Sequence, residues 1–180
     1  MIRLRMISAA LLFNSRGELL MMKRSERRTL SPGLWAAVGG HLEPHELNDP
    51  YAAVLREIEE ETGLRPTQMT GLRLQYILLR LNGSEIRQQF FYVGHTDAEP
   101  CVQTDEGELH WIGKEAILDR PLPYIFRMLL EHYLRNGPAP DPWLATAGRE
   151  DGGPAMYWTP LRDPPPPGVY ETGFPITNEP

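Results

Sequence analysis

Hydrophobic and polar positions along the chain predict a series of strands. Residues 72–81 and 85–94 are rich in Leu, Ile, Phe, Tyr and Val, and Asn82-Gly83 between them is a strong signal for a two-residue hairpin turn. A second hairpin is expected near the N-terminus, where a turn at 14–17 separates two apolar segments. The predicted strands are residues 3–13, 18–23, 34–38, 72–81, 85–94 and 109–112.

Two helices are predicted by their end signals and by their apolar spacing. Asp49 followed by Pro50 is typical of a helix start, and Gly63 of a helix end. Residues 122–135 carry apolar side chains spaced for one helical face. The order of strand pair, helix, several strands and helix predicts a mixed β-sheet flanked by helices, an α/β or α+β sandwich.

The C-terminal quarter of the chain differs from the rest in composition. Eleven of the 18 prolines lie in residues 137–180, including four in a row at 164–167. We therefore expect a domain at 1–137 and a proline-rich C-terminal extension at 138–180 with little regular secondary structure. The extension also contains Trp143 and Trp158, which predicts that it packs along the domain or contributes to a homodimer.

Composition and charge narrow the class of protein. The 180 residues are 41% hydrophobic and 23% charged, as in an ordinary globular protein, and no segment is long enough to cross a bilayer. The net charge of −6 argues against nucleic acid or an anionic membrane as a partner. The single cysteine, Cys101, excludes an intramolecular disulfide and indicates a cytoplasmic location.

Three glutamates are crowded on one edge of the first predicted helix. Glu57, Glu60 and Glu61 have the spacing i, i+3, i+4 and border the apolar stripe of that helix. Like charges at this spacing destabilise a helix by roughly 0.2–0.5 kcal/mol per pair. A hard divalent cation such as Mg²⁺ removes the repulsion, because it prefers carboxylate oxygens. On the helix alone, a solvated acidic face explains the pattern equally well.

The surrounding residues resemble the Nudix box, G-x5-E-x7-R-E-U-x-E-E-x-G-U, in which U is a bulky aliphatic residue. The segment from Arg56 to Leu64 fits its second half in full, whereas nine residues instead of seven separate Glu46 from Arg56. The surplus pair is best placed at Leu47-Asn48, before the helix. The residues that match fixed positions of the box are Gly40, Glu46, Arg56, Glu57, Glu60, Glu61 and Gly63.

The resemblance implies a Nudix fold and a metal-dependent hydrolase of the MutT-like type. It implies Mg²⁺, or alternatively Mn²⁺, held by carboxylates and by one main-chain carbonyl. It also implies that Glu57 helps to activate water and that Arg56 orients a glutamate. The implied metal ligands are Gly39, Glu57, Glu60, Glu61 and Glu106, with Asp105 and Glu108 as alternatives to Glu106.

Three further residues are candidates for contact with a substrate. Lys23 and Arg24 have side chains suited to phosphate, although a solvated basic loop is the alternative interpretation. Trp35 has a ring suited to stacking on a base, although a core tryptophan is the commoner outcome.

The substrate implied by the resemblance is a small nucleotide with a diphosphate linkage. The MutT-like sequence before the box favours a nucleoside triphosphate, including an oxidised one such as 8-oxo-dGTP. ADP-ribose, dinucleoside polyphosphates and NADH are the alternatives. A non-catalytic nucleotide-binding Nudix module is the alternative class, and retention of all three glutamates argues against it.

Overall fold

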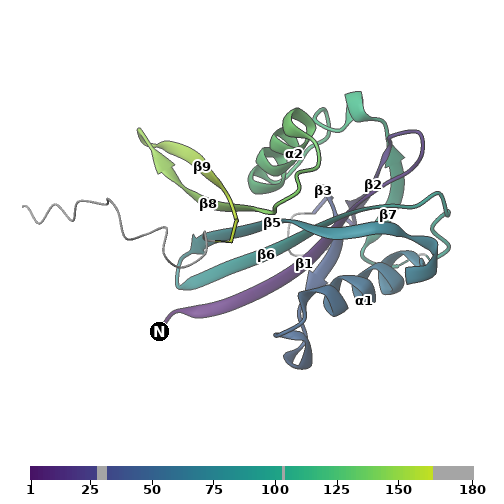
Figure 1. Ribbon diagram of the computed structural model, residues 1–180, viewed down its shortest axis with the longest axis horizontal. Coiled ribbons are helices and arrows are strands. Elements are labelled where there is room, and N and C mark those ends of the chain that lie inside the picture. Colours follow the sequence, from purple (N-terminus) through teal and green to yellow (C-terminus); the bar gives the residue numbers. More distant parts are fainter. Residues whose placement is uncertain (28–31, 103, 164–180) are drawn as a thin grey trace, which may run out of the picture.

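The computed structural model describes residues 1–27, 32–102 and 104–163, and its centre is a mixed β-sheet (Figure 1). The strands run in the order β3-β2-β1-β6-β5-β8-β9, while β4 pairs with β1 and β7 with β2. The elements in chain order are β1 (Arg3–Phe13), β2 (Leu19–Arg24), β3 (Trp35–Ala36), β4 (Val38–His41), η1 (Pro44–Glu46), α1 (Pro50–Thr62), η2 (Pro66–Gln68), β5 (Thr70–Asn82), β6 (Glu85–His95), β7 (Gly107–Ile112), η3 (Lys114–Ala116), α2 (Tyr124–Asn136), β8 (Trp143–Glu150) and β9 (Gly153–Pro160).

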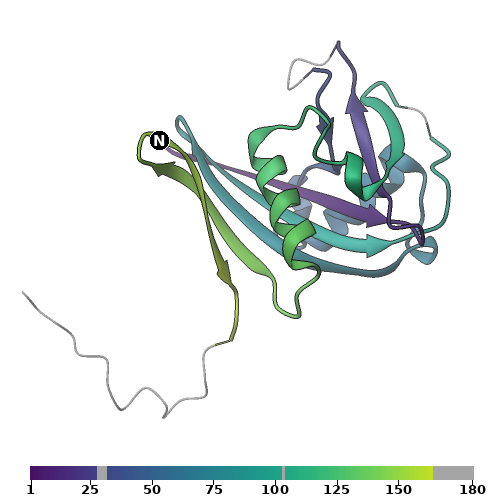
Figure 2. The same cartoon turned by 90° about the horizontal axis from the view of Figure 1, so that it is seen from above.

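The two helices cover opposite faces of the sheet, which confirms the predicted sandwich (Figure 2). Ile58 of α1 packs with the apolar side chains on one face, and Leu129 of α2 with those on the other. Successive side chains of β1 point to opposite faces of the sheet and so contribute to both apolar layers. Leu11 packs on the α2 side and Leu12 on the α1 side. None of the described helices combines the length and apolar character needed to span a membrane.

Helix α1 begins and ends where its sequence predicts. The carboxylate of Asp49 accepts a hydrogen bond of 3.0 Å from the backbone N–H of Ala52, and Pro50 is the first helical residue. At the other end, Gly63 has a φ of 74°, and its N–H donates to the carbonyl oxygen of Glu59. Both ends of the helix are therefore set by local chemistry.

The two predicted hairpins differ in detail from the observed ones. Strands β1 and β2 share only the Phe13–Leu19 pair, because β4 occupies the neighbouring stretch of β1 and β2 turns away to pair with β3 and β7. Strands β5 and β6 do form a long antiparallel pair. Their last pair joins Asn82 to Glu85, so the turn lies at 83–84, one residue later than predicted.

The prediction of little regular secondary structure in 138–180 is wrong for β8 and β9. These strands form an antiparallel hairpin, and β8 continues the main sheet by pairing in parallel with β5. The ring of His132 on α2 lies between Trp143 and Trp158, with centroid distances of 4.9 and 4.1 Å. The prolines of β9 are tolerated because edge strands need fewer ladder hydrogen bonds. The proline run at 164–167 lies outside the described residues.

Candidate active site

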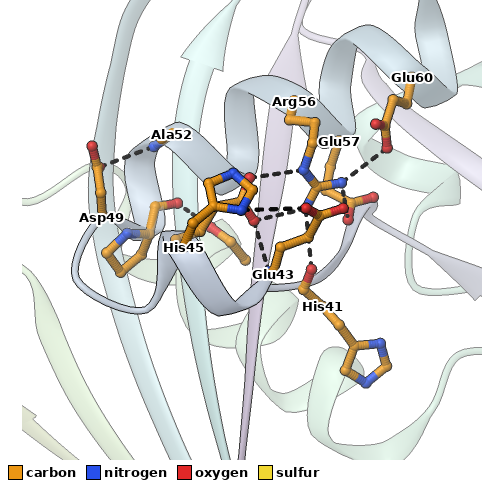
Figure 3. Close-up of polar contacts among 11 residues, drawn as sticks. His41, Glu43, His45, Asp49, Ala52, Arg56, Glu57 and Glu60 are labelled. Carbon is orange, nitrogen blue, oxygen red and sulfur yellow. Dashed lines mark hydrogen bonds and ion pairs between the residues drawn. The ribbon is translucent and has the colours of Figure 1, made fainter.

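Arg56 is the centre of a polar network between α1, η1 and β4 (Figure 3). Its Nε and Nη2 donate to the two carboxylate oxygens of Glu46 at 2.8 and 2.9 Å. Its Nη1 donates to Glu57 and to Glu60, both at 2.9 Å, and Nη2 also reaches the carbonyl oxygen of His41 at 3.1 Å. One guanidinium thus fixes three carboxylates and the end of β4 through charge-assisted bonds.

Glu46 binds Arg56 although nine residues instead of seven separate the two. It ends the short turn η1, where the backbone N–H of Glu43 also donates to its Oε2 at 2.8 Å. The Arg56 hydrogen bonds lower the pKa of Glu46 to about 2, against the opposing effect of burial. Leu47 and Asn48, the expected surplus pair, lie in the exposed turn between η1 and α1. Their exposure explains how extra residues fit without moving Glu46.

The two consecutive glycines of β4 allow the helix carboxylates to approach the sheet. A Cβ atom on Gly40 would lie 2.5 Å from Oε1 of Glu57. Gly39 has a φ of 147°, and a Cβ atom there would lie 2.3 Å from the carbonyl oxygen of Ser8. The N–H of Gly39 donates to Oε2 of Glu61 at 2.8 Å.

Three carboxylates meet at this point of the sheet. Burial, together with the neighbouring Glu57 and Glu106, raises the pKa of Glu61 to about 8. The hydrogen bond from the N–H of Gly39 acts in the opposite direction and lowers this pKa. Burial also raises the pKa of Glu57, although its contact with Arg56 opposes the shift. Crowded and poorly solvated carboxylates of this kind are the oxygen donors that a hard divalent cation neutralises.

The carboxylates lie beside a large cavity on the α2 side of the sheet. Its volume is about 950 Å³, and Glu57, Glu106 and Gly39 contribute to one part of its wall. Glu61 is buried behind these residues at 6% exposure. Glu60 does not line the cavity, and its side chain is 58% exposed.

Asp105 and Glu106 precede β7, and Glu108 is its second residue; of these three acidic residues, only Glu106 lines this cavity. Asp105 and Glu108 line a second space of about 660 Å³, together with Lys23. Arg24 borders both cavities. Antiparallel pairing of β2 with β7 brings Glu106 to the site, because it places Arg24 opposite Gly107.

Trp35 lies in the core instead of in the large cavity. Its side chain is 7% exposed, it packs with the cluster beneath α2, and the guanidinium of Arg120 lies 5.1 Å from its ring. A base therefore has no open face of Trp35 on which to stack. The structure corrects the prediction in favour of the core alternative.

The donor set fits a hard divalent cation. Arg56 engages only one oxygen each of Glu57 and Glu60, so each carboxylate keeps a second oxygen for a metal. Carboxylates and main-chain carbonyls are the ligands that Mg²⁺ prefers. Within the described ranges, no three His, Cys, Asp or Glu side chains are already gathered in the geometry of a metal site.

Sequence reasoning missed several residues of the cavity wall. Arg80, Arg87 and Gln89 come from the β5–β6 hairpin, and Tyr124 begins α2. The signal for the two arginines was present, because each interrupts a hydrophobic strand. Their position opposite one another depends on the exact turn residues, which the sequence did not settle.

Comparisons with known proteins agree with this fold. A family model described as NUDIX domain matches residues 3–130. An uncharacterised Nudix hydrolase of Pseudomonas aeruginosa is 46% identical over 57 residues, which cover 31% of this chain and 32% of that protein. An isopentenyl-diphosphate Δ-isomerase of Pectobacterium atrosepticum is 36% identical over 97 residues, or 53% of each chain. The match thus spans about a third and about half of these two relatives.

A solved structure extends the similarity to most of the chain. The MutT protein of Methanosarcina mazei Go1 superposes with a TM-score of 0.64 at 27% identity. The superposition covers 74% of this chain and 95% of that one. It supports the mixed sheet and the position of α1 over most of the chain.

Proposed function

The chain belongs to the Nudix family, and from this premise we propose that it is a divalent-metal-dependent hydrolase that cleaves the diphosphate linkage of a small nucleotide. The observation that carries the proposal is the meeting of Glu57, Glu61 and Glu106 beside a cavity large enough for a nucleotide. Acidic side chains crowded in this way repel one another when all are ionised, and a divalent cation bound between them would remove that repulsion.

In the proposed reaction, some residues of the site bind the metal ion and others transfer a proton. Glu57, Glu61, Glu106 and the carbonyl of Gly39 would hold Mg²⁺ or Mn²⁺, and Glu60 remains a predicted ligand from the edge of α1. When bound, such an ion lowers the pKa of a water molecule and neutralises phosphate oxygens. Glu57 would accept a proton from the attacking water, and its position in the cavity wall supports this role.

Basic residues complete the site. Arg56 fixes the orientation of Glu57, and Arg24 at the cavity wall is the candidate for phosphate contact. Lys23 faces the second space and is the weaker candidate.

The favoured substrate is a nucleoside triphosphate, including an oxidised one such as 8-oxo-dGTP. This choice rests on the MutT-like sequence before the box and is supported by the superposition on a MutT protein. ADP-ribose and dinucleoside polyphosphates remain alternative substrates. Whichever of these substrates the protein uses, we propose that it is located in the cytoplasm.

The proposal is tested by a hydrolysis screen of a nucleotide panel with Mg²⁺ and with Mn²⁺, in which phosphate and diphosphate release are measured. We expect Glu61→Gln to lower kcat for any substrate found by roughly two orders of magnitude, because it removes one charged metal ligand. Glu59→Gln is the matched control, since Glu59 lies on the same helix and is exposed.

Two outcomes would overturn the assignment. Equal activity of wild type and Glu61→Gln would remove the metal site from the mechanism. The panel also includes isopentenyl diphosphate, because one similar protein is named as its isomerase. Isomerisation of that compound with the diphosphate intact, and no release from any nucleotide, would replace hydrolysis with isomerisation.

A further inference from the structure

Three arginines lie side by side in one row across three neighbouring strands. Arg5 of β1 pairs with Arg87 of β6, and Arg87 pairs with Arg80 of β5. Adjacent strands are only about 4.8 Å apart, and like charges directly opposite one another destabilise a sheet. The row therefore requires a compensating negative charge.

The residues that the structure describes supply this charge for only part of the row. The Oε1 atom of Glu85 accepts from Nε of Arg87 at 2.6 Å, and its Oε2 lies 3.1 Å from Nε of Arg5. Glu85 is buried at 8% exposure, and its pKa is lowered chiefly by the hydrogen bond from Arg87. One carboxylate is thus shared by two guanidinium groups.

Arg80 is left without such a partner. Among the described residues it makes no hydrogen bond or ion pair, and its Nε is buried with no acceptor. Burial lowers the pKa of Arg80, and the charge of Arg87 lowers it further. A buried donor without an acceptor is uncommon in proteins and calls for an explanation.

Arg80 and Arg87 line the same cavity as Glu57 and Glu106, but at a distance from them. Ala9 of β1 pairs with Gly39 on one side and with Phe91 of β6 on the other. Because Gly39 lies at the carboxylates, Phe91 is the residue of β6 that lies closest to them along the strand direction. Arg87 lies four residues before Phe91, or roughly 13 Å along the strand. This separation exceeds the spacing between the two phosphates of one diphosphate group.

We propose that Arg80 and Arg87 bind a second anionic group of the substrate, a phosphate or carboxylate on the far side of a sugar or similar spacer from the diphosphate that is cleaved. Two neighbouring guanidinium groups present several N–H donors to one anion. The inference deepens the proposed function and rests on it for the position of the diphosphate. The substrate class is therefore a nucleoside diphosphate derivative with an additional remote negative charge.

The test uses pairs of compounds that differ in one remote anionic group. The pairs are NADP⁺ with NAD⁺, coenzyme A with dephospho-coenzyme A, and UDP-glucuronate with UDP-glucose. The first two pairs test a phosphate, and the third tests a carboxylate. Affinities are measured by calorimetry on the full chain in EDTA, so that no hydrolysis occurs, and kcat and KM are then measured with Mg²⁺.

We expect the more anionic member of at least one pair to bind about tenfold more tightly to the wild-type protein, as charge-assisted hydrogen bonds require. Arg80→Met should reduce that ratio to within about twofold and should raise KM more than it lowers kcat. Arg73→Met is the matched control, because Arg73 is an exposed arginine of the same strand that lines neither cavity described above.

The outcomes separate this inference from the proposed function. If wild type binds both members of every pair equally, or if Arg80→Met keeps the ratio, the anion site is overturned even when nucleotides are hydrolysed. If the ratio depends on Arg80 while the hydrolysis screen shows no turnover, the anion site stands and the hydrolase assignment fails. Arg80→Met removes an uncompensated charge, so an unchanged or higher Tm verifies folding.

Discussion

At the scale of single residues, the site depends on how one guanidinium is shared among several acceptors. Arg56 binds Glu46, Glu57 and Glu60 at once, so the structural carboxylate and the candidate metal ligands are coupled. Loss of Glu46 would leave Nε of Arg56 without its carboxylate acceptor and would loosen the guanidinium that also holds Glu57 and Glu60. Glu46 therefore contributes to stability directly and to the reaction only through Arg56.

This coupling predicts a pH-dependent effect of Glu46→Gln on stability. The pKa of Glu46 is about 2 in the folded protein and near 4.5 when unperturbed, so its ionised form stabilises the fold above pH 4.5. The stabilisation is lost as the pH falls towards 2. We expect the variant to lose about 1–3 kcal/mol of unfolding free energy at pH 7.

Urea unfolding of wild type and Glu46→Gln at pH 7, 5 and 3 measures the effect. The difference between the two proteins should shrink as the pH falls, whereas Glu59→Gln on the exposed side of α1 should show little difference at any pH. A difference that is the same at all three pH values would argue against the Arg56 contact as its source.

Gly40 provides a second prediction at this scale. A methyl group at Gly40 would displace the carboxylate of Glu57, whose Oε1 lies 2.5 Å from the position of the new atom. The displaced group is the end of a flexible side chain, so we expect a small change in Tm and a fall in kcat of about tenfold or more. Gly113→Ala, where the nearest atom is 3.5 Å away, is the control. A large loss of Tm with unchanged kcat would show that Gly40 serves the fold alone.

At the scale of elements, the sequence predicted features that local chemistry decides. Both ends of α1 were predicted to the residue, because the Asp49 cap and the positive φ of Gly63 need no distant partner. The spacing of Glu57 and Glu61 likewise followed from the helical period alone. The choice of Glu106 over Asp105 and Glu108 was open, because it depends on how β7 pairs with β2.

The β5–β6 turn shows how a local signal can be wrong by one residue and so change which side chains lie opposite one another. A two-residue turn at Asn82-Gly83 would have placed Arg80 opposite Glu85, where the two charges would have paired. The observed turn at 83–84 places Arg80 opposite Arg87 instead. The register of β6 is also constrained by its eleven pairs with β1, which a short turn motif does not report.

At the scale of the whole molecule, the C-terminal hairpin bears on whether a domain boundary lies at residue 137. Proline content suggested an extension at 138–180, and the division at residue 137 remains a prediction. However, β8 adds to the sheet beside β5, and Trp158 stacks on His132 of α2. Contacts of this kind favour a hairpin that unfolds together with the rest of the sheet.

Trp158→Ala tests this cooperativity. The indole contacts His132 and Tyr76, with centroid distances of 4.1 and 5.7 Å, and we expect its loss to lower the unfolding free energy by about 2–4 kcal/mol in a single transition. Tyr157→Ala is the control, because the neighbouring side chain points to the other face and is 48% exposed. Urea unfolding followed by both circular dichroism and tryptophan fluorescence should give coincident curves. Separate transitions, or equal stability of the two variants, would mean that the hairpin folds independently and that residue 137 marks a true boundary.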